Sequence, residues 1–261
     1  MSGAAGKART GPWHHLRLEV TAMLAAFQFL TLAPAIIKRP FTAPELGRAI
    51  AYYPLVGLAL GALLTGLRWG LGLALPPPVV SAAVLAAWAV ATGGLHLDGF
   101  LDSCDGVLGG FTPEDRLRIL RDEHKGAYAL IGGVLLLLLK YTSLAASPSI
   151  AILLAPLLGR WAMTTAVVAF PYARASGLGR DIKDGADWPH AALGTAFAVT
   201  CAWMIAGWLG LLALGLAALS LLAIARYVLA RLPGLTGDIY GAICELTELA
   251  VLLLFASRLH L

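Results

Sequence analysis

The sequence predicts an all-α fold: a polytopic integral membrane bundle of about seven transmembrane helices, preceded by an N-terminal interfacial or re-entrant helix. Of its 261 residues, 59% are hydrophobic and only 13% are charged, whereas soluble domains carry about 25% charged residues. Several apolar runs of twenty or so residues are long enough to cross a hydrocarbon core of ~30 Å. One integral membrane domain over 1–261, with a polar tail at 1–17, is the simplest organisation of this chain.

Hydropathy gives the expected position of each helix. The seven predicted spans are 49–74, 77–97, 127–147, 149–170, 191–207, 209–229 and 238–257. The apolar segment before them, 18–37, contains Glu19, Gln28 and Pro34. We therefore expect this segment to lie in the interface or to re-enter the bilayer.

The charges predict an orientation. If the seven spans alternate, 15 of the 19 Lys and Arg residues fall on one side. The positive-inside rule makes that side cytoplasmic. The net charge of +4 therefore needs no nucleic-acid partner to explain it. All fifteen acidic residues fall on or near the same side, seven of them in a predicted cytoplasmic loop at 98–126, and orientation does not require them there. Their gathering suggests a site.

Three aspartates in this stretch are the strongest chemical signal. Asp98, Asp102 and Asp105 are spaced i, i+4 and i+7, which puts them on one face of a helix that carries them. Such a cluster needs a compensating cation, and hard oxygen ligands favour Mg²⁺, especially beside a phosphorylated substrate. His96 could orient a metal-bound water, act as a base, or hydrogen-bond a neighbour. The alternative is a solvated helix end.

Two further groups adjoin apolar helices. Asp122 and Lys125 precede the span at 127–147; Asp122 could cap this helix, and Lys125 could anchor it at the interface or bind a phosphate. Arg160 lies inside an apolar span, where inserting it costs roughly 2.5–3.5 kcal/mol. We expect it to face a cavity or an acidic partner. Arg174 belongs to a Gly-rich basic loop that suits a polyanionic substrate.

The last span carries Asp238, Glu245 and Glu248 at i, i+7 and i+10, which places them on one helix face. Glu248 lies about ten residues into an apolar segment, where a lone carboxylate is costly. A partner such as Arg160, or a second metal, would remove that cost.

These elements together resemble the cobalamin synthase family, the adenosylcobinamide-GDP ribazoletransferases. The matching stretches are TGGLHLDGFLDSCDG at 92–106, RDEHKGAYA at 121–129, APLLGRWAM at 155–163, FPYAR and SGLG within 170–179, and LTGDIYGAICELTE at 235–248; YYPLVGLALG at 52–61 extends the likeness. Two departures are FLTLAPAI near the N-terminus and Cys244 where the family has Asn.

The resemblance implies the last assembly step of cobalamin (vitamin B12) biosynthesis. A Mg²⁺-dependent enzyme of the bacterial inner membrane, its site facing the cytoplasm, would join adenosylcobinamide-GDP to α-ribazole or its 5′-phosphate and release GMP. Corrinoid, ribazole and membrane lipid are the implied partners; association with further copies or with other cobamide-assembly enzymes stays open.

The resemblance also implies roles for individual residues. Asp98, Asp102 and Asp105 would bind the metal and take part in catalysis, with Asp238 and Glu245 completing the metal shell or binding the nucleoside. His96 or one carboxylate would accept a proton. The expected substrate-binding residues are Lys125, Arg160, Arg174 and Asp122.

Two other classes remain as alternatives. A CDP-alcohol phosphotransferase uses similar metal chemistry, and Asp102 to Gly106 resemble the opening of its aspartate motif, although the continuation of that motif is missing. A secondary transporter would place charges near the bilayer midplane and show inverted repeats, whereas these charges gather at one face.

Overall fold

The computed structural model describes residues 12–257, so the first eleven residues of the predicted polar tail lie outside it. The described chain is built from helices, joined by turns and one isolated β-bridge between Tyr172 and Leu235. Five helical segments in it are long and apolar enough to cross a membrane, and a pair of helices bent by 90° makes a sixth if the pair is counted as one span. The predicted all-α, polytopic membrane fold is confirmed.

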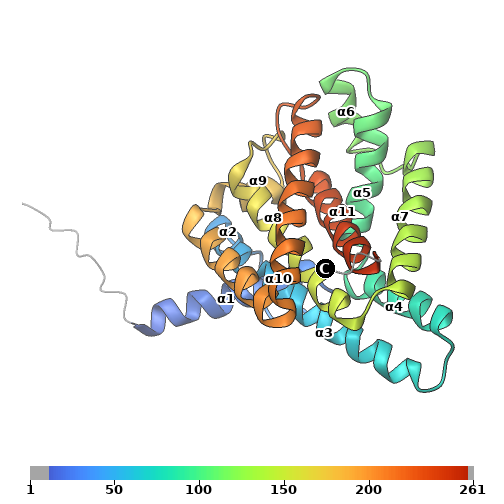
Figure 1. Cartoon of the computed structure of the whole chain (residues 1–261). Coiled ribbons are helices and arrows are strands. Elements are labelled where there is room, and N and C mark those ends of the chain that lie inside the picture. The colour runs from blue at the N-terminus through green and yellow to red at the C-terminus, as the bar shows by residue number, and fades with distance from the viewer. Residues whose placement is uncertain (1–11, 258–261) are drawn as a thin grey trace, which may run out of the picture.

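The N-terminal helix ends seven residues before the end of the predicted segment 18–37. α1 (Pro12–Leu30) ends at Leu30 and is not among the helices apolar enough to span. Pro34 cannot continue a helix, and the side chain of Gln28 binds the folded-back chain, accepting from the amide of Ile37 at 2.8 Å and donating to its carbonyl at 3.1 Å. In Figure 1, α1 extends sideways from the other helices.

The next elements give the first span. α2 (Ala43–Ala49), the short η1 (Ile50–Tyr52) and α3 (Tyr53–Gly72) form one segment of 30 residues. The backbone of α3 approaches α8 (Ser149–Ala169) closely, because a β-carbon on Gly57 would lie 2.2 Å from the carbonyl oxygen of Pro156. Small residues allow such contacts between membrane helices.

The segment predicted as a single span at 77–97 is broken. α4 (Pro77–Ala91) ends six residues early, and the chain bends by 90° into α5 (Leu95–Ser103). Gly93 and Gly94 have φ of 60° and 68°, a backbone conformation that residues with a β-carbon rarely adopt. Asp98 and Asp102 therefore lie on a separate helix beyond this bend.

The predicted loop at 98–126 is largely helical. It contains most of α5, then the π-helical turn η2 (Cys104–Leu108) and α6 (Pro113–Ile119). α7 (Ala127–Ala146) follows, and later α9 (Leu178–Gly185) and α11 (Gly237–Ala256). In Figure 1, α5, α6, α9 and the start of α11 gather at one end of the molecule.

α10 (Trp188–Leu229) is a helical hairpin. It reverses at Gly207, whose φ of 55° and ψ of −132° are not helical. A β-carbon on Gly210 would lie 1.9 Å from the carbonyl oxygen of Ala202, although residues eight apart in a straight helix are separated by about 12 Å. Its two halves match the spans predicted at 191–207 and 209–229. The structural count of five or six spans treats them as one helix, which accounts for the seven predicted from the sequence.

Candidate functional site

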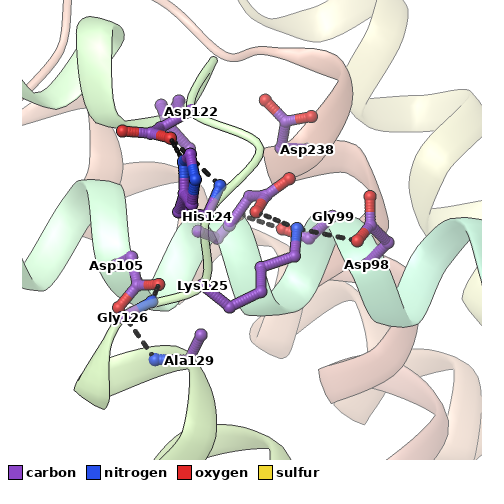
Figure 2. Close-up of polar contacts among 12 residues, drawn as sticks. Asp98, Gly99, Asp105, Asp122, His124, Lys125, Gly126, Ala129 and Asp238 are labelled. Atoms are coloured by element: carbon purple, nitrogen blue, oxygen red, sulfur yellow. Dashed lines mark hydrogen bonds and ion pairs between the residues drawn. The ribbon is translucent and has the colours of Figure 1, made fainter.

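A lysine between two aspartates forms the exposed part of the site. Nζ of Lys125 lies 2.7 Å from Oδ1 of Asp98 and also donates a hydrogen bond to Oδ1 of Asp102. Partial burial of the ammonium would lower the pKa of Lys125, but the hydrogen bonds and negative charge of the two carboxylates outweigh it and raise that pKa. Two carboxylate oxygens thus converge on one ammonium nitrogen, as Figure 2 shows for Asp98.

Asp105 does not share this face, contrary to the expectation from its spacing. Its two oxygens accept hydrogen bonds from the backbone amides of Gly126 (2.6 Å) and Ala129 (2.9 Å), at the start of α7. α5 ends at Ser103 and gives way to the π-helical turn, whose wider period no longer repeats the α-helical face. Figure 2 shows Asp105 directed toward Gly126 and Ala129, away from Asp98.

Asp122 also has a local partner. Its Oδ1 accepts from the amide of His124 at 3.0 Å and lies 2.8 Å from Nδ1 of the same residue. The hydrogen bond from that amide lowers the pKa of the Asp122 carboxyl. The pair shapes the loop that delivers Lys125, and a direct contact of Asp122 with substrate stays a prediction.

A close crossing of α5 and α11 brings Asp238 to the same region. A β-carbon on Gly99 would lie 2.9 Å from the carbonyl oxygen of Asp238, and one on Gly241 would lie 2.9 Å from that of His96. Asp238 accepts a hydrogen bond from Arg174 at 2.5 Å. Figure 2 places Asp238 near Gly99 and Asp98.

A cavity of about 280 Å³ opens beside Asp98. Four residues singled out from the sequence line it: His96, Asp98, Arg174 and Asp238. Aromatic residues that the sequence did not reveal also line it: Phe29, Tyr53, Tyr172 and Tyr240. Tyr53, Tyr172 and Tyr240 lie within the stretches that carry the family resemblance, but no spacing or polarity in the sequence marks them as lining residues.

A buried ion network lies deeper in the bundle. Arg160 forms an ion pair with Glu248, the acidic partner anticipated for it. Nζ of Lys140 lies 2.5 Å from a carboxylate oxygen of both Glu245 and Glu248, and 4.6 Å from the ring centre of Trp88. The role of Lys140 had no sequence signal, because its partners are 105 and 108 residues away.

This network separates some predicted residues from the aspartates. Glu245 is engaged by Lys140, and Arg160 reaches the cavity only through His96, whose Nδ1 is 3.2 Å from a guanidinium nitrogen. Within residues 12–257, no three His, Cys, Asp or Glu side chains are arranged to hold a metal ion. The structure therefore brings together Asp98, Asp102, Lys125, Arg174, Asp238 and His96, but not Asp105, Glu245 or Arg160.

Fold and site define a class: a multi-pass α-helical membrane protein with a polar site of carboxylates and cations at one end of its bundle. A family model described as cobalamin-5-phosphate synthase matches residues 22–256. The chain belongs to the cobalamin-5-phosphate synthase family, which makes it a transferase of cobalamin biosynthesis.

Individual relatives agree. A protein of Pseudomonas savastanoi pv. phaseolicola, named adenosylcobinamide-GDP ribazoletransferase, is 40% identical over 237 residues, covering 88% of this chain and 97% of the relative. Proteins with the same name from Desulfitobacterium hafniense (40% identical; 87% and 93% covered) and a Roseiflexus species (36%; 87% and 86%) are also similar. No solved structure matches the chain. This membership decides against the lipid phosphotransferase and the transporter.

Proposed function

We propose that this chain joins adenosylcobinamide-GDP to α-ribazole or α-ribazole 5′-phosphate and releases GMP, with Mg²⁺ as cofactor. The relatives' name, adenosylcobinamide-GDP ribazoletransferase, supports these substrates. The single observation that supports the chemistry is the convergence of Asp98 and Asp102 on the ammonium of Lys125. The positive charge of Lys125 lies between the two carboxylates that we propose as ligands of the metal.

The donor set fits Mg²⁺. This ion is commonly held by one or two carboxylates together with substrate phosphates and water, rather than by an all-protein cage. Asp98 and Asp102 would hold it, and Asp238, which lines the same cavity as Asp98, would bind its water shell. Asp105 fits this role less well, because both of its oxygens already accept backbone amides. Bound there, Mg²⁺ would neutralise charge on the pyrophosphate.

Phosphoryl transfer depends mainly on positioning and charge neutralisation. In the proposed step, the 3′-hydroxyl oxygen of the ribazole bonds to the cobinamide-linked phosphorus, and the bond from that phosphorus to the bridging oxygen breaks, so that GMP leaves. Lys125 and Arg174 would stabilise the charge on the phosphate oxygens. The hydroxyl proton passes to Asp98 or Asp238, the two carboxylates that line the cavity.

We also propose that the site faces the cytoplasm of a bacterial inner membrane. The loops beside it, 109–126 and 170–187, carry Arg116, Arg118, Arg121, Arg174, Arg180 and Lys183. Positive charges in short loops favour the cytoplasmic side, which is also where a nucleotide-linked substrate is available.

The test follows GMP release from adenosylcobinamide-GDP and α-ribazole 5′-phosphate by purified protein in liposomes, with and without Mg²⁺. We expect Asp98→Asn and Asp102→Asn to lose at least a hundredfold in kcat, because each removes charge at the reacting phosphate. Asp184→Asn is the matched control, since Asp184 forms an exposed ion pair with Arg180 on α9. GMP release that is indifferent to Mg²⁺, or unaffected by both aspartate substitutions, would contradict the proposal.

A further inference from the structure

Unpartnered polar atoms gather around the cavity. In the part of the chain that the structure describes, eight buried side-chain nitrogen or oxygen atoms have no hydrogen-bond partner. Four of them belong to cavity-lining residues: Oη of Tyr53, Nε2 of His96, Nε of Arg174 and Oη of Tyr240. Tyr53 and His96 are each 1% exposed. Burying a polar group without a partner is costly, so such a cluster indicates a ligand.

These atoms are mostly donors. The guanidinium of Arg160 can only donate, so Nδ1 of His96, 3.2 Å away, accepts, and the ring proton lies on Nε2. Nε of Arg174 also can only donate, whereas the two tyrosine hydroxyls can do either. A ligand that satisfies this set must be rich in acceptor oxygens or nitrogens.

Aromatic rings form the rest of the wall. The rings of Tyr172 and Tyr240 are stacked, with centres 6.0 Å apart and planes at 28°, and those of Phe29 and Tyr53 lie 6.4 Å apart. Aromatic side chains bind flat bases by stacking, whichever base it is. The volume of about 280 Å³ lies just below the range of pockets for drug-sized ligands, roughly 300–1,000 Å³. A nucleoside has this scale, whereas a corrin macrocycle is too large.

One end of the cavity suits an anion. α9 begins there at Leu178, after the N-cap residue Gly177, and has no side-chain cap; Gly177, Leu178 and Gly179 all line the cavity. Gly177 has φ of 108°, and a β-carbon on Gly179 would lie 2.1 Å from Oη of Tyr172, so glycines let the backbone border the cavity. The amides at a helix N-terminus attract phosphate.

We propose that this cavity binds a ribonucleoside 5′-monophosphate unit, with the base against the aromatic wall and the ribose and phosphate oxygens on the donors. This inference rests on the proposed function, whose reaction contains two such units: GMP, as the leaving group, and α-ribazole 5′-phosphate, as the acceptor. Asp98 lines the cavity and also contacts Lys125. A nucleotide in the cavity therefore lies beside the carboxylates proposed to hold the cation.

The test uses the full chain in nanodiscs and the double variant Tyr53→Phe/Tyr240→Phe, which removes only the two unpartnered hydroxyls. Dissociation constants are measured for GMP, α-ribazole 5′-phosphate and unphosphorylated α-ribazole, and KM for each substrate. We expect the double variant to raise the dissociation constant of one of the two monophosphates by tenfold or more, because each lost hydrogen bond lowers affinity by roughly three- to tenfold. Unphosphorylated α-ribazole tests the end of the cavity that suits an anion. If α-ribazole 5′-phosphate is the occupant, the unphosphorylated compound should bind more weakly than the phosphate.

Tyr52→Phe is the matched control. Tyr52 is the adjacent residue, but its hydroxyl donates to Glu19 at 2.8 Å and it does not line the cavity. We expect this control to leave nucleotide affinity unchanged. The melting temperature separates a binding role from a structural one: removing unpartnered hydroxyls should leave it equal or higher in the double variant while affinity falls.

The outcomes separate the inference from the function. The monophosphate that the double variant binds more weakly than the wild type is the occupant of the cavity. If GMP release proceeds but neither affinity nor KM changes in that variant, the nucleotide cavity is wrong and the proposed function stands. If the folded wild-type protein neither releases GMP nor binds either monophosphate, both are wrong.

Discussion

Asp105 differs from Asp98 and Asp102 in what its oxygens contact. Both of them bind amides at the start of α7, which otherwise has no side-chain cap. The first amides of a helix have no partner within it, and a negative charge there is favourable. Asp105 thus holds in place the helix start that follows Lys125, and so controls the position of a cation one residue away.

We predict that Asp105→Asn loosens the start of α7. The amide of asparagine has one oxygen and one NH₂ group, so it can satisfy only one of the two backbone donors. Buried hydrogen bonds to a charged acceptor are worth about 1.5–3 kcal/mol, and hydrogen exchange at residues 126–130 should accelerate by tenfold or more. Asp122→Asn is the control, because its partner His124 lies in an exposed turn. Unchanged exchange at 126–130 would show that Asp105 does not cap this helix.

The role of a residue could be predicted from the sequence where its position carries a free-energy cost that only a partner removes. Arg160 and Glu248 could be paired in advance, because each is expensive alone in an apolar segment. The tyrosines of the cavity could not, since even within the stretches that carry the family resemblance nothing distinguishes a lining tyrosine from a packing one. Asp105 was assigned to the metal by a spacing that holds only while the α-helix continues.

At the scale of elements, the boundaries depended on backbone features. The reversal at Gly207 matched the predicted segments 191–207 and 209–229, because the gap between two apolar runs coincides with the turn. The ends of α1 and α4 were misplaced, since apolar residues continue past Leu30 and Ala91. Hydropathy reports the polarity of a stretch, whereas Pro34 and the positive φ of Gly93 and Gly94 decide where its helix stops.

The crossing of α5 and α11 carries the prediction at this scale. Gly99→Ala would place a β-carbon 2.9 Å from the carbonyl oxygen of Asp238, so the helices must separate and Asp98 moves relative to Asp238. We expect a destabilisation of about 1–3 kcal/mol, as for other overpacked contacts, and a loss of at least tenfold in kcat. Thermal unfolding in detergent and the GMP-release assay measure the two effects.

Gly215→Ala on α10 is the matched substitution. Its new β-carbon meets no atom within 4 Å, and alanine favours helix over glycine by about 1 kcal/mol. We expect its stability to be equal or higher and its activity unchanged. If Gly99→Ala behaved like Gly215→Ala, the close crossing would not be needed to position the carboxylates.

At the scale of the whole molecule, charge is divided between two places. Asp98, Asp102, Lys125, Arg174 and Asp238 lie at one end of the bundle. A second set, Lys140, Arg160, Glu245 and Glu248, is buried in its interior and formally neutral. The sequence predicted the first set of charges from the loops, but it assigned Glu245 to that site because Glu245 and Asp238 share one face of α11. Only the packing of α7 against α11, through Lys140, separates them.

The buried set links three spans, α7, α8 and α11, so its loss should affect the entire bundle. We predict that Lys140→Met lowers the free energy of unfolding by about 3–5 kcal/mol, because it leaves two carboxylates sharing one guanidinium in the interior. Adding Glu245→Gln should recover part of that loss, since the unpaired carboxylate is then removed. Unfolding in nanodiscs, analysed as a double-mutant cycle, measures both changes.

Arg180→Gln is the control, because it breaks only the exposed pair with Asp184. It should lower the free energy of unfolding by less than about 1 kcal/mol. A double variant no more stable than Lys140→Met alone would mean that Lys140 acts through packing against Trp88, and not by compensating the charge of Glu245.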